Sequence, residues 1–221
     1  MQVKLVSTTH STLQLKRQGI KTPEDLIVYC ARVSNPSNQF NNETAPKLTA
    51  YLIKHKHWSP FEMVDMTVEI KTSRAIAAQI LRHRSFSFQE FSQRYSEATD
   101  LEPIEWRLQG ATNRQVGDKK FELEDELNDA IDEFLGASIE VYDHLIKNGI
   151  AKECARMVLP LCTETTMYMK GSIRSWIHYI QIRAAQETQK EHREIAEKIK
   201  NIFISKFPNI SKALDWGKTN Q

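Results

Sequence analysis

The sequence predicts one helix-rich α+β domain spanning residues 1–221. Residues 121–147, 171–183 and 190–207 have the apolar spacing of amphipathic helices, whereas residues 61–71 alternate with the period of two that is typical of a strand. A chain of 221 residues with 40% hydrophobic residues can bury a sizeable core. No internal repeat, low-complexity tract or linker divides it, so we expect a single domain.

The first half opens with a strand over residues 2–7, indicated by alternating apolar side chains. A helix over 23–34 follows, because Thr22 suits the N-cap, Pro23 the first helical position, and acidic residues the first turn. Residues 35–44 are polar and predict a loop, and residues 48–53 a further helix. The strand at 61–71 precedes a helix over 74–83 capped by Ser73.

The second half continues with a short strand at 104–107 and a glycine-bearing loop at 108–115. The long helix 121–147 is closed by Asn148-Gly149 as its C-cap. A shorter helix holds residues 154–157, and the threonine-rich stretch 163–168 predicts a strand. Helices at 171–183 and 190–207 complete the chain. The acidic residues between 122 and 133 indicate the solvated face of the long helix.

Charge, cysteine content and hydrophobicity argue against a disulfide-rich secreted protein and against a membrane protein. The formal net charge is only +2, so any affinity for anions must come from local clustering. Cys30, Cys154 and Cys162 are too few and too scattered for a disulfide framework and form no CxxC pair, which favours a reducing compartment. No stretch approaches the roughly 20 apolar residues of a membrane span, and the N-terminus lacks the apolar run of a signal peptide. We expect a cytoplasmic protein, in the host cytoplasm if its origin is viral, with no membrane partner.

The most informative stretch is 82–96, RHRSFSFQEFSQRYS. It combines arginines, serines, a histidine and a glutamate with phenylalanines and a tyrosine, a composition unlike that of a core helix or a solvated linker. Arginine binds phosphate and carboxylate groups bidentately, and hydroxyls can satisfy the remaining acceptors. The stretch therefore indicates a site for a planar, phosphorylated ligand.

Six positions of this stretch, within thirteen residues, resemble the signature of the flavin-dependent thymidylate synthases: Arg82, His83, Arg84, Ser87, Ser92 and Arg94. Similar segments lie along most of the chain. Residues 31–34 resemble the family's N-terminal helix, 57–62 its His-x-Thr/Ser-Pro-Phe-Glu turn, and 156–161 its Ala-Arg-x-x-Leu-Pro segment. Arg183-Ala184 with Gln189 and Glu191 resembles its last active-site helix, and 106–115 the insert of some members.

The resemblance implies a helix-rich fold with a small antiparallel sheet and an enzyme, a methyltransferase, that makes dTMP from dUMP. The carbon donor would be 5,10-methylenetetrahydrofolate, with the reducing equivalents of NADPH passed through bound FAD. It also implies a homotetramer with active sites between subunits and no cysteine nucleophile. In that case the two ends of the stretch 82–96, one directed to flavin and one to nucleotide, would serve different active sites.

Nucleotide-binding residues carried over from the family have complementary chemistry. A guanidinium aimed at the N3–C4–O4 edge of uracil would make C5 nucleophilic by stabilising negative charge on that edge. The resemblance assigns this catalytic role to Arg183. The alternative role for Arg183 is a surface salt bridge with Glu187, four residues later. The residues expected to bind dUMP are Gln79, Arg82, Glu90, Phe91, Ser92, Gln93, Arg94, Arg156 and Arg183. Ser92 has no adjacent base and is interpreted as a binding hydroxyl.

FAD would have to be held without a Rossmann loop, because no G-x-G-x-x-G occurs. The residues expected to bind FAD are Ser59, Arg82, His83, Arg84, Glu90, Arg174 and His178. His178 stands where some relatives have asparagine, and Glu187 where some have histidine. For both His83 and Arg156, a simple helix C-terminal cation remains an alternative.

We expect no metal site, because His55 and His57 are two residues apart and no nearby acid or cysteine completes a ligand set. A nucleic-acid-binding module is the rival from another class, since arginines and aromatics interleave in 82–96. The near-neutral charge argues against it. A flavoprotein of different chemistry on the same scaffold is the second rival.

Overall fold

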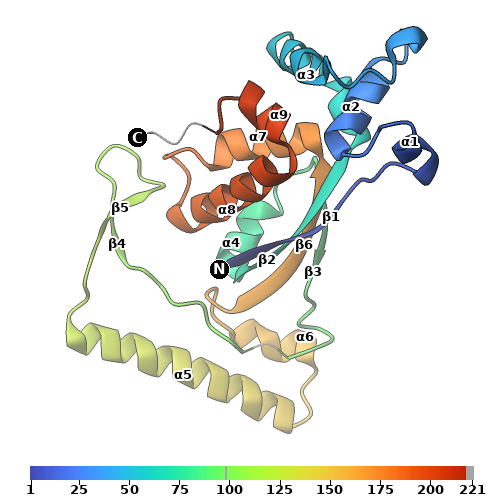
Figure 1. The fold of residues 1–221 in the computed structure, drawn as a ribbon. Coiled ribbons are helices and arrows are strands. Elements are labelled where there is room, and N and C mark those ends of the chain that lie inside the picture. The colour runs from blue at the N-terminus through green and yellow to red at the C-terminus, as the bar shows by residue number, and fades with distance from the viewer. Residues whose placement is uncertain (98, 218–221) are drawn as a thin grey trace.

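A four-stranded antiparallel sheet is the centre of the fold in the computed structural model, which describes residues 1–97 and 99–217 (Figure 1). Its strand order is β1-β2-β6-β3, with bounds β1 Gln2–Thr8, β2 Asp65–Ser73, β3 Ser87–Glu90 and β6 Glu164–Ser172. β2 and β6 pair along their whole length, from Asp65 opposite Ser172 to Ser73 opposite Glu164. The sheet is therefore built from strands that lie far apart in the sequence.

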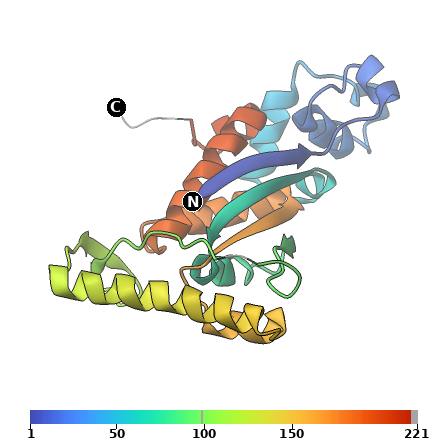
Figure 2. The same ribbon diagram turned by 90° about the horizontal axis from the view of Figure 1, so that it is seen from below.

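Helices cover the sheet and frame one end of it (Figures 1 and 2). α4 (Arg74–Ile80) and α7 (Ile173–Arg183) contact β2 and β6, and α8 (Lys190–Lys206) contacts α4, α7 and β1. Between β1 and β2 the chain forms α1 (Leu13–Arg17), α2 (Pro23–Ala31), the 3₁₀ turn η1 (Pro36–Asn38), α3 (Ala45–Lys54) and the 3₁₀ turn η2 (Ser59–Met63). The remaining elements are β4 (Arg107–Gln109), β5 (Gly117–Lys120), α5 (Asp125–Lys147), α6 (Lys152–Ala155), η3 (Arg156–Val158) and α9 (Pro208–Ala213).

The core lies between the sheet and these helices. Alternate residues of β2 point inward, and Met66, Val68 and Ile70 have no exposed surface. Trp176 of α7 is equally buried, and its indole N–H donates to the carbonyl of Met66 over 2.9 Å. This pairing satisfies the single polar group of a large aromatic side chain in the core.

β2 and β6 both run directly into a helix through a serine. Ser73 leads into α4 and Ser172 into α7, where the Ser172 hydroxyl accepts from the backbone N–H of Ser175. Because the two strands are antiparallel, α4 and α7 begin at opposite ends of the sheet and fold back over it. The segment after α4 thus meets the end of α7, which is where the candidate site forms.

Most expected elements are present, with shifted bounds. The helix expected over 23–34 is α2, and Thr22 and Asp25 form a full capping box. The strand expected from residue 61 starts at Asp65, since Pro60 and the buried Phe61 belong to η2. The helix expected from residue 171 starts at Ile173, because β6 extends to Ser172, beyond the end at residue 168 that was expected for this strand. The long helix begins at Asp125 rather than at residue 121, and Asn148 is its C-cap, with Gly149 at a φ of +80°.

Other expectations were wrong in detail. The helix expected to residue 83 ends at Ile80 and leaves residues 82–84 in a turn. Of the expected strand 104–107, only Arg107 is in β4, and part of the expected loop 108–115 lies in the β4–β5 hairpin. The expected loop 35–44 contains η1. α1, β3, β5 and α9 are short elements without a clear periodic pattern, and the sequence did not predict them.

Candidate active site

Arg183, the last residue of α7, reaches the turn that carries the signature residues 82–84. Its Nε donates to Nε2 of His83 over 2.8 Å. Burial, together with the positive charge of Arg183 and the proximity of His178, lowers the pKa of His83 to about 4. His83 is therefore neutral near pH 7 and accepts this hydrogen bond. Because α4 ends at Ile80, His83 lies beyond the helix terminus, and a neutral imidazole does not fit the helix C-terminal cation considered from the sequence. Arg183 contacts His83 rather than Glu187, the partner in its alternative interpretation.

A buried chain of polar groups lies behind this pair. The Tyr179 hydroxyl is 3.1 Å from Nε2 of His192, and Nδ1 of His192 is 3.4 Å from Oε1 of Gln79. Tyr179 and His192 have no exposed surface. Burial lowers the pKa of His192 to about 3 and raises the pKa of Tyr179 above its usual range, so both groups stay neutral. The Tyr179 ring also lies edge-on to His83, with ring centroids 4.9 Å apart.

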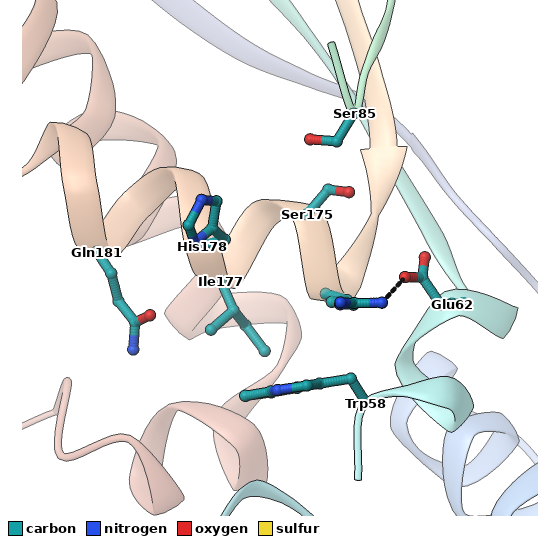
Figure 3. A pocket seen from close by; sticks show the side chains of 8 residues that line it. Trp58, Glu62, Ser85, Ser175, Ile177, His178 and Gln181 are labelled. Atoms are coloured by element: carbon teal, nitrogen blue, oxygen red, sulfur yellow. Dashed lines mark hydrogen bonds and ion pairs between the residues drawn. The ribbon is translucent and has the colours of Figure 1, made fainter. Parts of the chain in front are cut away.

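A cavity of about 450 Å³ runs along the outer side of α7 (Figure 3). Figure 3 shows Trp58 facing Ile177 across the cavity, with His178 and Gln181 on successive turns of α7. An ion pair of 3.0 Å joins Arg174 to Glu62 at one end. The lining residues are Trp58, Glu62, Ser85, Arg174, Ser175, Ile177, His178 and Gln181. An apolar wall combined with cationic and hydroxyl donors fits a flat ring system that carries phosphate.

Some of the residues expected to bind FAD meet at this cavity. Arg174 and His178 line it from one helical face, as their spacing of four predicts. Ser85 lines it directly after Arg84, whereas Arg82 and Arg84 are exposed and Ser59 follows the lining residue Trp58. Arg183 is nine residues beyond Arg174, about 180° around the helix at roughly 100° per residue, and so points to the other side.

Residues 92–94, expected to bind the nucleotide, lie at the opposite end of β3 from residues 82–84. The segment rests on α6, where Arg94 pairs with Glu153 over 3.3 Å. Arg156 begins η3, directly after α6, and is half-buried, while Ser92 and Phe91 are exposed. Gln93 is only 5% exposed, and its buried side-chain nitrogen has no partner among the described residues. An anion or carbonyl of a bound ligand would satisfy this donor.

Glu90 ends β3 and is held within the protein. Its Oε1 accepts from Arg74 Nη1 over 3.2 Å and from the Thr165 hydroxyl over 3.0 Å. Arg74 also donates to the carbonyl of Phe91 over 3.2 Å. These contacts fix the end of β3 from which residues 92–94 follow.

Two of the three cysteines are poorly suited to act as nucleophiles. Burial raises the pKa of the Cys30 and Cys162 thiols, which disfavours the nucleophilic thiolate. Among the residues that the structure describes, no group of three or more histidine, cysteine and acidic side chains is placed to hold a metal ion. No helix within residues 1–97 and 99–217 is both long and apolar enough to cross a membrane.

Several residues that shape this site were not predicted from the sequence. His192 and Tyr179 resemble ordinary helix residues in the sequence. Gln79, the partner of His192, lies more than a hundred residues earlier, so no sequence spacing indicates the contact. Arg74 likewise resembles a first-turn helix residue. Trp58 and Glu62 lie in the turn 57–62 but carried no assigned role. The packing of α4, α7 and α8 against one another brings Gln79, Tyr179 and His192 together, and the contact of η2 with α7 places Glu62 beside Arg174.

Comparisons with known proteins find relatives along almost the whole chain. A family model described as "Thymidylate synthase complementing protein" matches residues 17–209. A probable flavin-dependent thymidylate synthase of Paramecium bursaria Chlorella virus 1 is 51% identical, covering 98% of this chain and 100% of that protein. A flavin-dependent thymidylate synthase of a Synechocystis species is 50% identical, with the same coverage of both chains.

A solved structure has a similar fold. The crystal structure of a UMP/dUMP methylase, PolB from Streptomyces cacaoi, bound with 5-Br dUMP superimposes with a TM-score of 0.79 at 25% identity. The match covers 97% of this chain and 94% of that one. The fold, the signature residues present within the stretch 82–94 and the extent of the family match lead to one assignment: the chain belongs to the flavin-dependent thymidylate synthase family.

Proposed function

We propose that this protein makes dTMP by reductive methylation of dUMP, with Arg183 as the catalytic residue. The contact between Arg183 and His83 carries the proposal. It uses Nε of the guanidinium and leaves the two Nη groups without a partner among the described residues. A neutral histidine as acceptor leaves the positive charge of Arg183 uncompensated, and a cation held in this way is suited to stabilise charge on the N3–C4–O4 edge of uracil.

The phosphate of dUMP is assigned to the far end of the signature stretch. Ser92, Gln93, Arg94 and Arg156 supply hydroxyl, amide and guanidinium donors there, and the unpartnered nitrogen of Gln93 supports the assignment. Phe91, Gln79 and Arg82 would flank the nucleotide. Glu90 would contact a ligand through Oε2, because its Oε1 is occupied by Arg74 and Thr165.

FAD is assigned to the cavity along α7, where it would supply the reducing equivalents. Arg174 and His178 offer donors to its phosphates, and Ser59 with residues 82–84 would extend the contact beyond the cavity. Trp58 and Ile177 offer an apolar wall, a combination that suits an aromatic ring system with a charged tail. NADPH as reductant and 5,10-methylenetetrahydrofolate as carbon donor complete the proposed reaction.

A homotetramer with active sites between subunits is part of the proposal. α5 lies at the periphery of the chain (Figure 1), and it exposes Leu127, Phe134 and Val141 by 52%, 67% and 49%. These residues are seven apart and share one helical face, which is the pattern of a helix that packs against another. The flavin and phosphate ends of the signature stretch are also separated by β3, about 13 Å for four strand residues at roughly 3.3 Å each, as two different active sites would require.

The deciding experiment is a turnover assay with dUMP, methylenetetrahydrofolate, NADPH and FAD, followed by chemical identification of the product. We expect dTMP and a yellow purified protein. The proposal would be refuted if the purified protein is colourless and if the spectrum of FAD does not change when the protein is added. A different product from bound flavin would favour a flavoprotein of other chemistry, and salt-sensitive binding of single-stranded oligonucleotides without any dUMP effect would favour the nucleic-acid-binding alternative.

A further inference from the structure

The polar chain that includes His192 and Gln79 ends on a carboxylate. Glu191 Oε1 accepts from Nη2 of Arg107 over 2.6 Å, and its Oε2 accepts from Nε2 of Gln189 over 2.9 Å. Arg107 comes from β4 and is also bonded to Glu105 over 3.1 Å. A carboxylate paired with a guanidinium can only accept hydrogen bonds, so this end of the chain has a fixed polarity.

The fixed carboxylate determines the orientation of the next two amides. Gln189 must present its amide nitrogen to Glu191, so its oxygen faces Gln79. Gln79 must then present its own nitrogen to that oxygen, and the two atoms are 2.6 Å apart. The opposite orientation of either amide would place two acceptor oxygens, or two donor nitrogens, in contact. Glu191 thus specifies how Gln79 is turned.

The same constraint extends into the core. Because Gln79 turns its oxygen toward His192, Nδ1 of His192 carries the proton, and Nε2 must accept from the Tyr179 hydroxyl. His192 and Tyr179 are both fully buried, so no water competes for these positions. All donors in the chain therefore point the same way, from Tyr179 toward Glu191.

We propose that Glu191, held by Arg107, is a positioning residue that fixes the side-chain amide of Gln79 so that its remaining N–H is presented to an oxygen of the bound nucleotide. The inference rests on the proposed function, which places Gln79 at dUMP. One hydrogen of the Gln79 nitrogen is committed to Gln189, and the other is available to a ligand. Glu191 would act on substrate binding only through Gln79.

The first test compares Glu191→Gln with Glu194→Gln by equilibrium dialysis of labelled dUMP against the FAD-loaded protein. An amide at 191 can donate as well as accept, so it no longer specifies the polarity of the chain. We expect dUMP to bind about ten-fold more weakly, the effect of roughly one hydrogen bond. Glu194 lies one turn further along α8 and pairs with Lys190 at 3.8 Å, so its variant should bind like the wild type.

A second step distinguishes positioning from a general structural effect. In a Gln79→Ala background there is no amide to orient, and Glu191→Gln should then cause no further loss. A ten-fold loss that persists in that background would overturn the inference. If the unaltered protein does not bind dUMP, the proposed function fails and the inference with it. Equal binding by Glu191→Gln and the unaltered protein would overturn the inference alone.

The polarity itself can be measured without a variant at position 191. In protein labelled with ¹⁵N-histidine, the His192 signals, identified by their loss in a His192→Gln variant, should show a protonated Nδ1 and an unprotonated Nε2. The protonation state is measured on the unaltered protein, and His192→Gln serves only to assign the signals, so the result remains decisive if Glu191→Gln does not fold. A protonated Nε2 would mean that the chain runs in the opposite direction, and the proposal would be wrong.

Discussion

Arg183 and His83 are one hundred residues apart in the sequence, and a hydrogen bond of 2.8 Å from Nε of the arginine to Nε2 of the histidine joins them. The contact ties the end of α7 to the turn after α4. It holds the guanidinium by its inner nitrogen, so the outer nitrogens remain available to a ligand. The neutrality of His83 is what makes the contact possible.

Replacing Arg183 with alanine should abolish most dTMP formation while the protein retains its fold and flavin. Loss of a preorganised charge at a reacting group typically lowers kcat by about 100- to 1,000-fold. Arg183→Lys should be nearly as impaired, because an ammonium group cannot bind His83 and reach the nucleotide together. Steady-state kinetics and the flavin absorbance spectrum check this, with exposed Arg17→Ala as the control. Normal turnover by Arg183→Ala would show that Arg183 is not the catalytic residue.

The neutral His83 predicts a loss of stability in acid. Its pKa is about 4 in the folded chain against an ordinary value of 6.5. Between these values the unfolded chain binds a proton that the folded chain does not, so this contribution is fully present above pH 6.5 and declines as the pH falls toward 4. His83→Gln keeps an acceptor for Arg183 but cannot titrate. Its Tm should therefore fall less between pH 7 and pH 4.5 than that of the unaltered protein.

The matched control for that pH experiment is His144→Gln, which alters an exposed residue of α5. Its Tm should follow the unaltered protein at every pH. Because burial lowers the pKa of His192 as well, some acid sensitivity should remain in His83→Gln. Identical pH profiles for His83→Gln and the unaltered protein would contradict the assignment of a neutral, buried His83.

Gly171 of β6 provides space for the ring of Phe86 next to the signature turn. A Cβ at this position would lie 2.5 Å from Cδ1 of Phe86, well inside contact distance. We expect Gly171→Ala to displace the ring and destabilise the fold by about 1–3 kcal/mol, measured by urea unfolding. FAD binding should weaken as well, because Phe86 follows Ser85 of the cavity. Gly136→Ala is the control: it lies in α5 with open space around it, and should stabilise the chain by about 0.5–1 kcal/mol.

Arg174 should contribute directly to FAD affinity. Arg174→Met keeps the length and apolar character of the stem but removes the cation from the cavity, and we expect FAD to bind about ten-fold more weakly, as for the loss of one charge-assisted hydrogen bond. Fluorescence titration of flavin into flavin-depleted protein measures this. Lys170→Met is the control, since this exposed cation pairs with Asp65 outside the cavity. If Arg174→Met and Lys170→Met bind FAD with equal affinity, the cavity is not the flavin-binding site.

The exposed apolar face of α5 predicts a self-associating protein. The unaltered protein should elute as a tetramer in gel filtration with light scattering. Phe134→Glu places a charge at the centre of the face and should yield smaller species with reduced activity, whereas Glu133→Gln, on the neighbouring residue, should remain tetrameric. A fully active monomer would contradict the proposal that subunits share the site.

Local chemistry predicted a substantial part of this protein. The capping residues Thr22 and Asp25 placed α2, the alternation of Met66, Val68 and Ile70 placed β2, and the motif within residues 82–94 indicated the family. Boundaries failed where a tertiary contact overrode the pattern. Residues 61–63 alternate like a strand, yet Phe61 is fully buried in a 3₁₀ turn that begins at Ser59.

The sequence by itself determined the ligand chemistry, because a cluster of arginines, serines and aromatics within one short stretch needs no folding to be recognised. Only the tertiary structure decided how the site is arranged. Adjacent antiparallel strands start α4 and α7 at opposite ends of the sheet, so His83 and Arg183 meet only when both helices fold back over it. The same packing encloses His192 between Tyr179 and Gln79, and burial then makes His83 and His192 neutral. Burial and long-range pairing are properties of the folded chain, and no local pattern carries them.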